Sequence, residues 1–177
     1  TNESAKNFKV VRVDAADLRT ENWTEYVEHS ASRTLENIDA FKEFLVVVER
    51  SDAMRKLLII DTVSDSRHYV ELPDEPHAIW FEDNEEFDDE WLRFVYSSLT
   101  TPDTVYDYHM RTHERVIQKQ EEVKDYHPAD FVAERVWAVA PDGVRVPISL
   151  VYKKGLDKNG ANPVWLYGYG AYGVHVD

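Results

Sequence analysis

Short apolar runs separated by turn residues form the clearest pattern in the first half of the chain. Residues 44–50 read Phe-Leu-Val-Val-Val-Glu-Arg, and residues 55–61 form a second apolar run after the turn at 51–53. A third run, residues 67–72, follows the turn at 62–66. Runs of this length, rich in β-branched side chains and bounded by turn residues, are typical of strands. We therefore predict three consecutive strands, the first of them buried.

The same order of strands and turns returns further along the chain. Strands are predicted at 78–81, 91–97, 104–110 and 115–118, and the corresponding runs of the two sets lie 47 to 49 residues apart. A repeat of roughly 40 to 50 residues with three or four strands is typical of β-propeller blades. Two blades cannot close a ring, and open strand edges are a liability in isolation. We therefore expect a piece of a longer propeller.

The chain before residue 41 gives weaker signals. Residues 8–13 read as a short strand, whereas residues 14–33 are mixed and polar, with Trp23 and Tyr26 as the expected anchoring side chains. Clear order is predicted only from Phe41 onward.

The character of the sequence changes between residues 120 and 130. The dipeptide His127-Pro128 interrupts any regular element, so a domain boundary is predicted there. Residues 131–139 predict a strand, and residues 144–152, where apolar side chains recur at every second position, predict its partner in an antiparallel hairpin. Pro147 cannot donate a hydrogen bond to a ladder, so we expect a bulge or an unpaired position at this residue. A polar loop, residues 153–162, follows the hairpin.

Residues 163–173 combine a short apolar run with glycine and tyrosine. Val164, Trp165 and Leu166 predict a buried strand, and the glycines after it allow tight turns and close approach of the backbone to another group. Tyr167, Tyr169 and Tyr172 lie within this glycine-rich run and carry hydroxyl groups on rigid rings. Two interpretations remain open from the residues alone: a wall of an active site, or a corner of packed aromatic side chains.

Composition and charge narrow the classes of function. The chain has 177 residues, a net charge of −14 and no cysteine, so a disulfide or a thiolate metal site is impossible. The charge argues against nucleic acid and anionic membrane surfaces as partners. It is compatible with cationic substrates and also with simple solubility. There is no apolar run of ~20 residues and no signal peptide at the start, which also lacks an initiator Met. We expect a cytoplasmic protein, of which this chain is a fragment.

No metal site or cofactor is predicted. Residues 82–90 form a strongly acidic loop, but they lack the spacing and the glycine of an EF-hand loop, so a solvated loop is the preferred interpretation. The seven histidines are scattered, and no pair has zinc-ligand spacing.

Three segments carry a resemblance to a known family. Residues 96–102 read Tyr-Ser-Ser-Leu-Thr-Thr-Pro and are followed by Val-Tyr-Asp-Tyr at 105–108. Residues 142–152 read Asp-Gly-Val-Arg-Val-Pro-Ile-Ser-Leu-Val-Tyr, and residues 166–173 read Leu-Tyr-Gly-Tyr-Gly-Ala-Tyr-Gly. Together the chain resembles the prolyl oligopeptidase family of serine peptidases, and within it the oligopeptidase B type. Before residue 90 the agreement is looser.

The resemblance implies a fold and a division into domains. The expected fold is mainly β: a partial β-propeller of about two C-terminal blades, followed by the first strands of an α/β-hydrolase domain. Residues 1–121 would belong to the propeller, and residues 122–177 to the crossover and the N-terminal strands of the peptidase domain. In the family the propeller admits only short peptides to the active site.

The resemblance also implies site residues. Tyr169 matches the family tyrosine whose hydroxyl helps to form the oxyanion hole, Tyr172 matches an aromatic residue that lines the substrate pocket, and Asp177 matches a carboxylate proposed to contact basic substrate residues. Tyr167 is expected to be structural. A tyrosine that only packs against its surroundings is the alternative for Tyr169, as a core ring is for Tyr172.

The catalytic groups themselves are not in this sequence. It contains no Gly-x-Ser-x-Gly, and the α/β-hydrolase order is Ser, Asp, His, so all three are expected beyond residue 177 and the fragment alone is expected to be inactive. The implied activity is hydrolysis of short, basic peptides after Arg or Lys, without a cofactor. A prolyl-specific peptidase and a non-catalytic propeller that serves as a binding module are the alternatives. The oligomeric state is not predicted.

Overall fold

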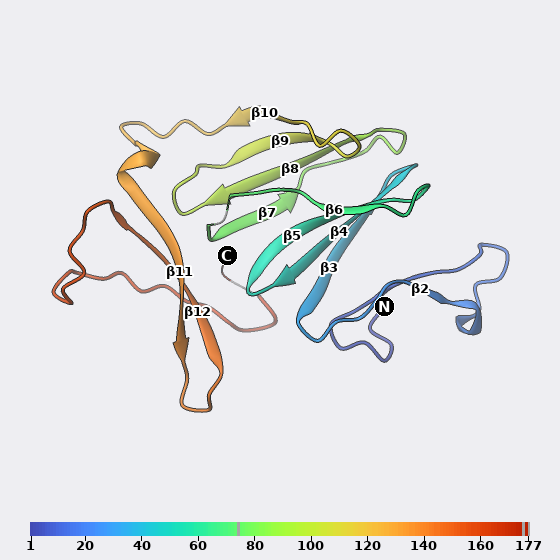
Figure 1. The fold of residues 1–177 in the computed structure, drawn as a ribbon, viewed down its shortest axis with the longest axis horizontal. Helices are drawn as coiled ribbons and strands as arrows, with labels where there is room; N and C mark the ends of the chain where they lie inside the picture. Colours follow the sequence, from blue (N-terminus) through green and yellow to red (C-terminus); the bar gives the residue numbers. More distant parts are fainter. Residues whose placement is uncertain (74, 175, 177) are drawn as a thin grey trace. The chain divides into compact units, whose positions relative to one another are not determined.

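The computed structural model of the chain describes residues 1–73, 75–174 and 176, and nearly all of its regular structure is β (Figure 1). The described residues divide into two compact units. The first comprises residues 1–71, 84–92 and 108–114, and the second comprises residues 72–83, 93–107 and 115–177. The predicted mainly-β fold is confirmed.

The first unit is built on a four-stranded antiparallel sheet in the order β3-β4-β5-β6. Its strands are β3 (Arg33–Ala40), β4 (Phe44–Ser51), β5 (Met54–Asp61) and β6 (Arg67–Tyr69). The two central strands have uninterrupted pairing from Phe44↔Asp61 to Ser51↔Met54. They are also the most apolar, because a central strand has neighbours on both edges and is covered on its faces.

Strand β3 was not predicted. Its sequence is polar, with Leu35 as its one buried side chain among the eight residues, and Ile38 is half exposed. The strand forms because β4 pairs with it along nearly its whole length, which satisfies backbone groups regardless of the polarity of the side chains. A register shift between Leu35 and Asn37 marks a bulge in this pairing.

A smaller antiparallel pair precedes this sheet. Strand β1 (Val10–Arg12) lies within the predicted run 8–13 and pairs with β2 (Thr24–Val27), which was not predicted. Tyr26 is half-buried against the core, and the guanidinium groups of Arg12 and Arg67 lie over its ring at 5.2 and 5.4 Å. The predicted anchoring role of Tyr26 therefore has a structural basis.

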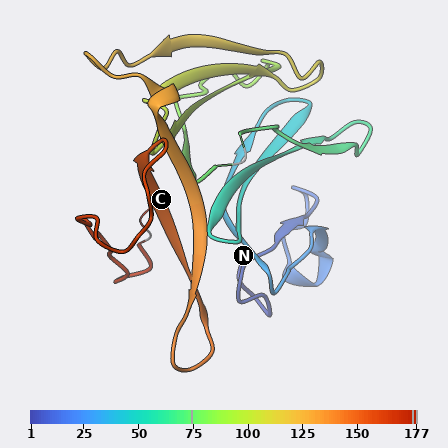
Figure 2. The ribbon, with the colours of Figure 1, turned by 60° about the vertical axis from the view of Figure 1, so that its left-hand side comes forward.

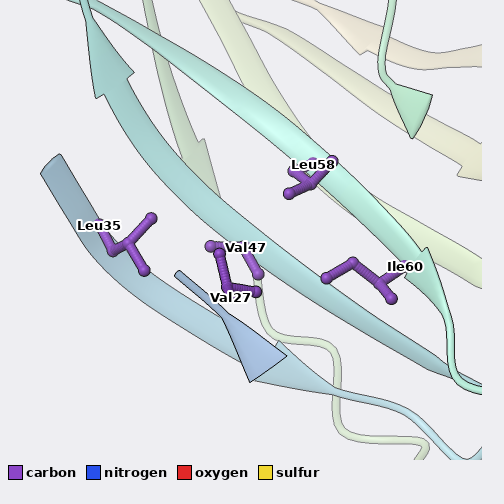
Figure 3. Close-up of a cluster of buried hydrophobic side chains, with 5 residues drawn as sticks. All are labelled: Val27, Leu35, Val47, Leu58 and Ile60. Atoms are coloured by element: carbon purple, nitrogen blue, oxygen red, sulfur yellow. The ribbon is translucent and has the colours of Figure 1, made fainter. Parts of the chain in front are cut away.

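The core of the first unit joins the strand pair to the sheet. Val27 packs with Leu35, Val47, Leu58 and Ile60, which come from β3, β4 and β5 (Figure 3). Val47 and Ile60 are completely inaccessible to solvent. This cluster explains why the apolar runs of β4 and β5 dominate the sequence pattern.

A second four-stranded antiparallel sheet has the order β10-β9-β8-β7 (Figure 1). Its strands are β7 (His77–Phe81), β8 (Trp91–Ser98), β9 (Thr104–His109) and β10 (Arg115–Gln120). Leu92, Phe94, Val95 and Tyr96 of β8 are buried, whereas every residue of the edge strand β10 is exposed. Two sheets of four sequential strands confirm the predicted propeller-blade pattern.

A long hairpin follows the second sheet. Strand β11 (Phe131–Val139) pairs with β12 (Arg145–Lys153), and Figure 2 shows the two strands running side by side to their tight turn. Gly143 in that turn has φ +84°, a conformation that favours glycine.

The irregularity predicted at Pro147 is absent. Pairing runs without a shift from Phe131↔Lys153 to Val139↔Arg145, with Pro147 opposite Trp137. Within this two-stranded ladder each strand retains an open edge, and open edges tolerate proline. No helix in the described residues is both long enough and apolar enough to cross a membrane.

Candidate functional site

The glycine- and tyrosine-rich segment forms no strand in the described part of the chain. Residues 163–174 follow β12 without regular structure, and the side chains of Val164, Trp165 and Leu166 are 83%, 91% and 86% exposed. The prediction of a buried strand at Val164–Leu166 is therefore wrong for this structure. A buried strand needs a neighbour that pairs with its backbone and layers that cover its side chains. Neither β11 nor β12 pairs with this segment.

The three tyrosines of the segment present their rings to solvent. Tyr169 is 51% exposed, Tyr167 70% and Tyr172 96%. Packing of these rings into a corner, the alternative to an active-site wall, is not seen in this structure. A tyrosine hydroxyl is a hydrogen-bond donor of the kind that stabilises an oxyanion as it develops.

A tight turn ends the segment. The amide of Val174 donates to the carbonyl of Ala171 at 3.0 Å, and the turn includes Tyr172 at φ 56° and Gly173 at φ +71°. Gly173 thus has the conformational role that the sequence predicted for the glycines. Asp177, the third predicted site residue, lies outside the described residues.

The polar loop before this segment is tied to the hairpin. Lys158 forms an ion pair with Glu134 of β11, and its ammonium lies 4.1 Å from the centre of the Tyr152 ring. The hydrogen bond from Lys158 lowers the pKa of the Glu134 carboxyl. The loop 153–162 is therefore fixed at one point to the strands that lead into the tyrosine segment.

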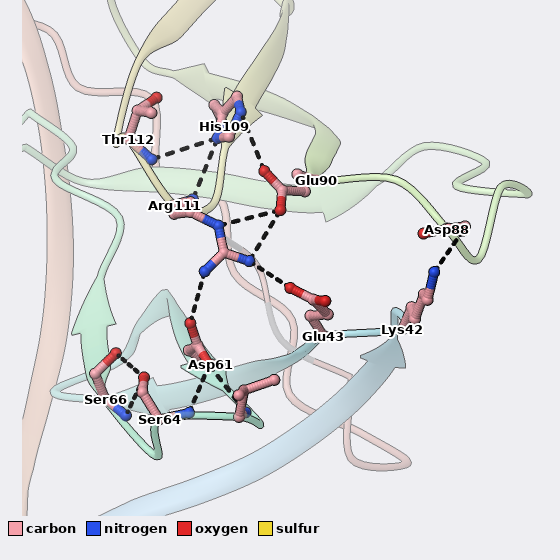
Figure 4. Close-up of polar contacts among 11 residues, drawn as sticks. Lys42, Glu43, Asp61, Ser64, Ser66, Asp88, Glu90, His109, Arg111 and Thr112 are labelled. Atoms are coloured by element: carbon pink, nitrogen blue, oxygen red, sulfur yellow. Dashed lines mark hydrogen bonds and ion pairs between the residues drawn. The ribbon is translucent and has the colours of Figure 1, made fainter.

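Arg111 is the centre of a polar cluster that the sequence did not reveal (Figure 4). Its guanidinium donates to Glu43 at 2.6 Å, to Asp61 at 3.1 Å and to Glu90 at 2.9 Å, and it lies over the Phe44 ring at 4.9 Å. Glu43 lies just before β4, Asp61 is the last residue of β5, and Glu90 lies just before β8. The hydrogen bond with Glu90 raises the pKa of Arg111. One guanidinium thus joins three carboxylates of the first unit and offsets part of their mutual repulsion.

Several acidic residues of the loop 82–90 also have defined partners. Asp88 forms an ion pair with Lys42 at 2.8 Å, and the carboxylate of Asp89 accepts a hydrogen bond from the amide of Trp91 at 3.0 Å (Figure 4 shows the Asp88 pair). The loop is therefore held in place at Asp88 and Asp89. The prediction of a solvated loop did not include these contacts.

Two histidines stack within the first unit. His68 lies on β6 and His113 in the β9–β10 turn, and their ring centres are 3.8 Å apart. Nε2 of His68 is 3.0 Å from the Tyr108 hydroxyl. Burial lowers the pKa of His68, and the neighbouring His113 lowers it further. Among residues 1–73, 75–174 and 176, no three His, Asp or Glu side chains are grouped so that they could hold a metal ion.

Comparison with known proteins identifies relatives along the whole chain. Residues 1–121 match the family model described as the N-terminal β-propeller domain of prolyl oligopeptidase. Dipeptidyl aminopeptidase BI of Pseudoxanthomonas mexicana is 35% identical over 176 residues, which cover 99% of this chain and 24% of that protein. The chain therefore spans about a quarter of the length of this curated relative.

Solved structures give the same picture. Oligopeptidase B from Trypanosoma brucei, with covalently bound antipain and in a closed form, superimposes with a TM-score of 0.79 at 30% identity, over 87% of this chain and 23% of that one. A structure from an analysis of two prolyl endopeptidases and their inter-domain dynamics superimposes with a TM-score of 0.85 at 26% identity, over 99% of this chain and 25% of that one.

Proposed function

Because this chain belongs to the prolyl oligopeptidase family of serine peptidases, we propose that the protein containing it is a serine oligopeptidase of the oligopeptidase B type. It hydrolyses short peptides on the carboxyl side of Arg or Lys. The observation that supports this proposal most is the likeness of 87% of the chain to oligopeptidase B of Trypanosoma brucei. The net charge of −14 is compatible with basic substrates, which it attracts at long range.

The proposed mechanism is acyl transfer through a serine nucleophile. The serine attacks the scissile carbonyl carbon, a histidine accepts the serine proton, and an aspartate orients that histidine. These three groups are expected in sequence beyond residue 177, since residues 1–177 contain no Gly-x-Ser-x-Gly. Negative charge then develops on the carbonyl oxygen, and Tyr169 donates a hydrogen bond to it from its phenolic hydroxyl.

The remaining site residues contact the substrate. Tyr172 contributes its ring to the wall of the substrate pocket, and Asp177 pairs with a basic side chain of the peptide. In this proposal residues 1–121 belong to the propeller, and residues 122–177 carry the crossover and the first part of the peptidase domain. The propeller admits only short peptides. The protein acts in the cytoplasm and needs no cofactor.

A prolyl-specific peptidase is the second candidate. The observation that favours it is the likeness to the prolyl endopeptidase structure, which extends over 99% of the chain with the higher TM-score of 0.85. A propeller without catalytic activity, used as a binding module, is a third candidate. It differs from the first two because it requires no nucleophile anywhere in the protein.

The experiment that separates these candidates measures kcat/KM of the full-length protein on four fluorogenic peptides. The peptides are identical except for Arg, Lys, Pro or Ala before the cleaved bond. We expect Arg and Lys to exceed Pro by about 100-fold or more, because a site built to pair with a charged side chain rejects one that leaves its carboxylates unpaired. A preference for Pro supports the second candidate, and no hydrolysis of any peptide supports the third.

A further inference from the structure

Glu75 is the centre of a hydroxyl cluster in the second unit. The residue lies in the connection before β7, and its carboxylate accepts hydrogen bonds from Tyr96, Ser98 and Thr100, each at 2.9 Å. The hydroxyl of Thr101 adds a longer bond of 3.4 Å. One carboxylate thus holds the end of β8 and the turn that follows it.

The cluster is well suited to fix the position of that turn. Burial raises the pKa of the Glu75 carboxyl, but the hydrogen bonds from Ser98, Thr100 and Tyr96 outweigh burial and keep the pKa below its ordinary value. The carboxylate is therefore charged at neutral pH, and hydrogen bonds to charged acceptors are the stronger kind. Ser98 also accepts hydrogen bonds from the amides of Thr100 and Thr101, at 3.1 and 2.9 Å, within the turn itself.

The same turn holds the segment that leaves the second sheet. The hydroxyl of Tyr126 donates to the backbone carbonyl of Thr100 at 2.9 Å. The Tyr126 ring stacks on Phe131, the first residue of β11, with the ring centres 5.4 Å apart. The amide of Glu121 donates to the carbonyl of Asp103 at 2.9 Å, just beyond the turn. Residues 122–130, the crossover segment, are therefore attached to the second sheet at the turn that Glu75 holds.

We propose that Glu75 is a positioning residue, which fixes the crossover segment through the turn at Thr100 and the hydroxyl of Tyr126. The start of β11 is thereby held in one place, and the hairpin β11–β12 carries that position on to the tyrosine segment. The role of Glu75 in holding the crossover segment does not depend on what the protein catalyses. Its expected effect on turnover rests on the function proposed above.

Limited proteolysis of the full-length protein with trypsin tests the structural part. Lys124 is exposed within the crossover segment, and Lys6 is an exposed reference site in the first unit. We expect Glu75→Gln, Thr100→Val and Tyr126→Phe each to accelerate cleavage after Lys124 by about three- to tenfold relative to cleavage after Lys6, the range expected for loss of a single hydrogen bond. Thr100→Ser keeps the donating hydroxyl and restores the wild-type rate. Tyr106→Phe is the matched control, because its ring contacts Tyr96 but its hydroxyl is not among those that bond Glu75.

Three outcomes overturn the proposal. Unchanged cleavage after Lys124 in all three variants would show that Glu75 and its turn do not hold the crossover segment. Acceleration in Tyr126→Phe alone shows that the crossover segment depends on the turn but not on Glu75. Equal acceleration at Lys124 and Lys6 shows a loss of overall stability instead of local release.

The kinetic part uses the same variants and the Arg peptide. If the crossover segment positions the oxyanion donor, kcat falls about three- to tenfold while KM changes little, and Thr100→Ser recovers kcat. An active wild-type protein whose variants show faster cleavage after Lys124 but unchanged kcat contradicts the kinetic part alone. An inactive wild-type protein contradicts the proposed function and leaves the proteolysis result to decide the structural part.

Discussion

Ile60 and Ile38 show that the burial of a side chain within a blade determines how much it contributes to stability. Both are isoleucines of the first four-stranded sheet, but Ile60 is fully buried in the core and Ile38 is 49% exposed. A buried isoleucine contributes both the transfer of its side chain out of water and the contacts that would otherwise become a cavity. The contrast makes the two positions a matched pair.

We predict that Ile60→Ala lowers the free energy of unfolding by about 2–5 kcal/mol, because the cluster of Figure 3 loses a central side chain. Ile38→Ala is the control, and we expect a much smaller loss, on the order of 0.5 kcal/mol. Denaturant titration monitored by tryptophan fluorescence measures both values. Equal losses for the two variants would contradict the assignment of the core.

The elements show which parts of the fold the sequence could predict. The strands β4, β5, β8 and β9 follow from their apolar runs, because their burial is encoded in their own side chains. Strand β3 could not be predicted, since its pairing with β4 stabilises a polar sequence. The opposite error occurred at Val164–Leu166, where a strand was predicted and none forms. An apolar sequence forms a strand only where a partner strand is present.

The candidate site residues were predicted from the family resemblance, which the local motif at residues 166–173 carries. Tyr169 and Tyr172 stand out because glycines surround them, whereas Arg111 and Glu75 have no such local signature. The carboxylate partners of Arg111 lie 21 to 68 residues away in sequence, and the hydroxyl partners of Glu75 lie 21 to 26 residues away. Only the folded chain brings these groups together.

The stacked pair of His68 and His113, which joins β6 to the β9–β10 turn, should make the stability of the fold depend on pH. The folded chain lowers the pKa of His68, whereas the unfolded chain has the ordinary value of about 6.5. The unfolded state therefore binds more protons just below that pH, so this contribution to stability is complete above about 6.5 and is lost as the pH falls towards the folded pKa.

We expect His68→Gln to reduce the dependence of the unfolding free energy on pH below about 6.5, because the variant lacks this titrating group. Denaturant titrations of the wild type and the variant at several pH values between 8 and about 5 give the two slopes. Coincident slopes would show that His68 does not contribute to the pH dependence.

At the scale of the whole molecule, the proposed function requires a nucleophile outside residues 1–177. We predict that a fluorophosphonate labels the full-length protein at a single serine within a Gly-x-Ser-x-Gly sequence. The serines of residues 1–177 should remain unmodified, because none lies in such a motif. Peptide mapping by mass spectrometry locates the adduct, and an adduct on a serine of this chain would require a different mechanism.

The turnover of Tyr169→Phe in the full-length protein tests the central claim most directly. The substitution removes only a hydroxyl from a side chain that is 51% exposed, so we expect an unchanged unfolding midpoint. Loss of one oxyanion donor lowers kcat by about 100- to 1,000-fold where such donors have been removed. Tyr167→Phe, on the same segment, is the matched control and should retain wild-type kcat. A Tyr169→Phe protein that folds normally and keeps its kcat would exclude Tyr169 from the oxyanion hole.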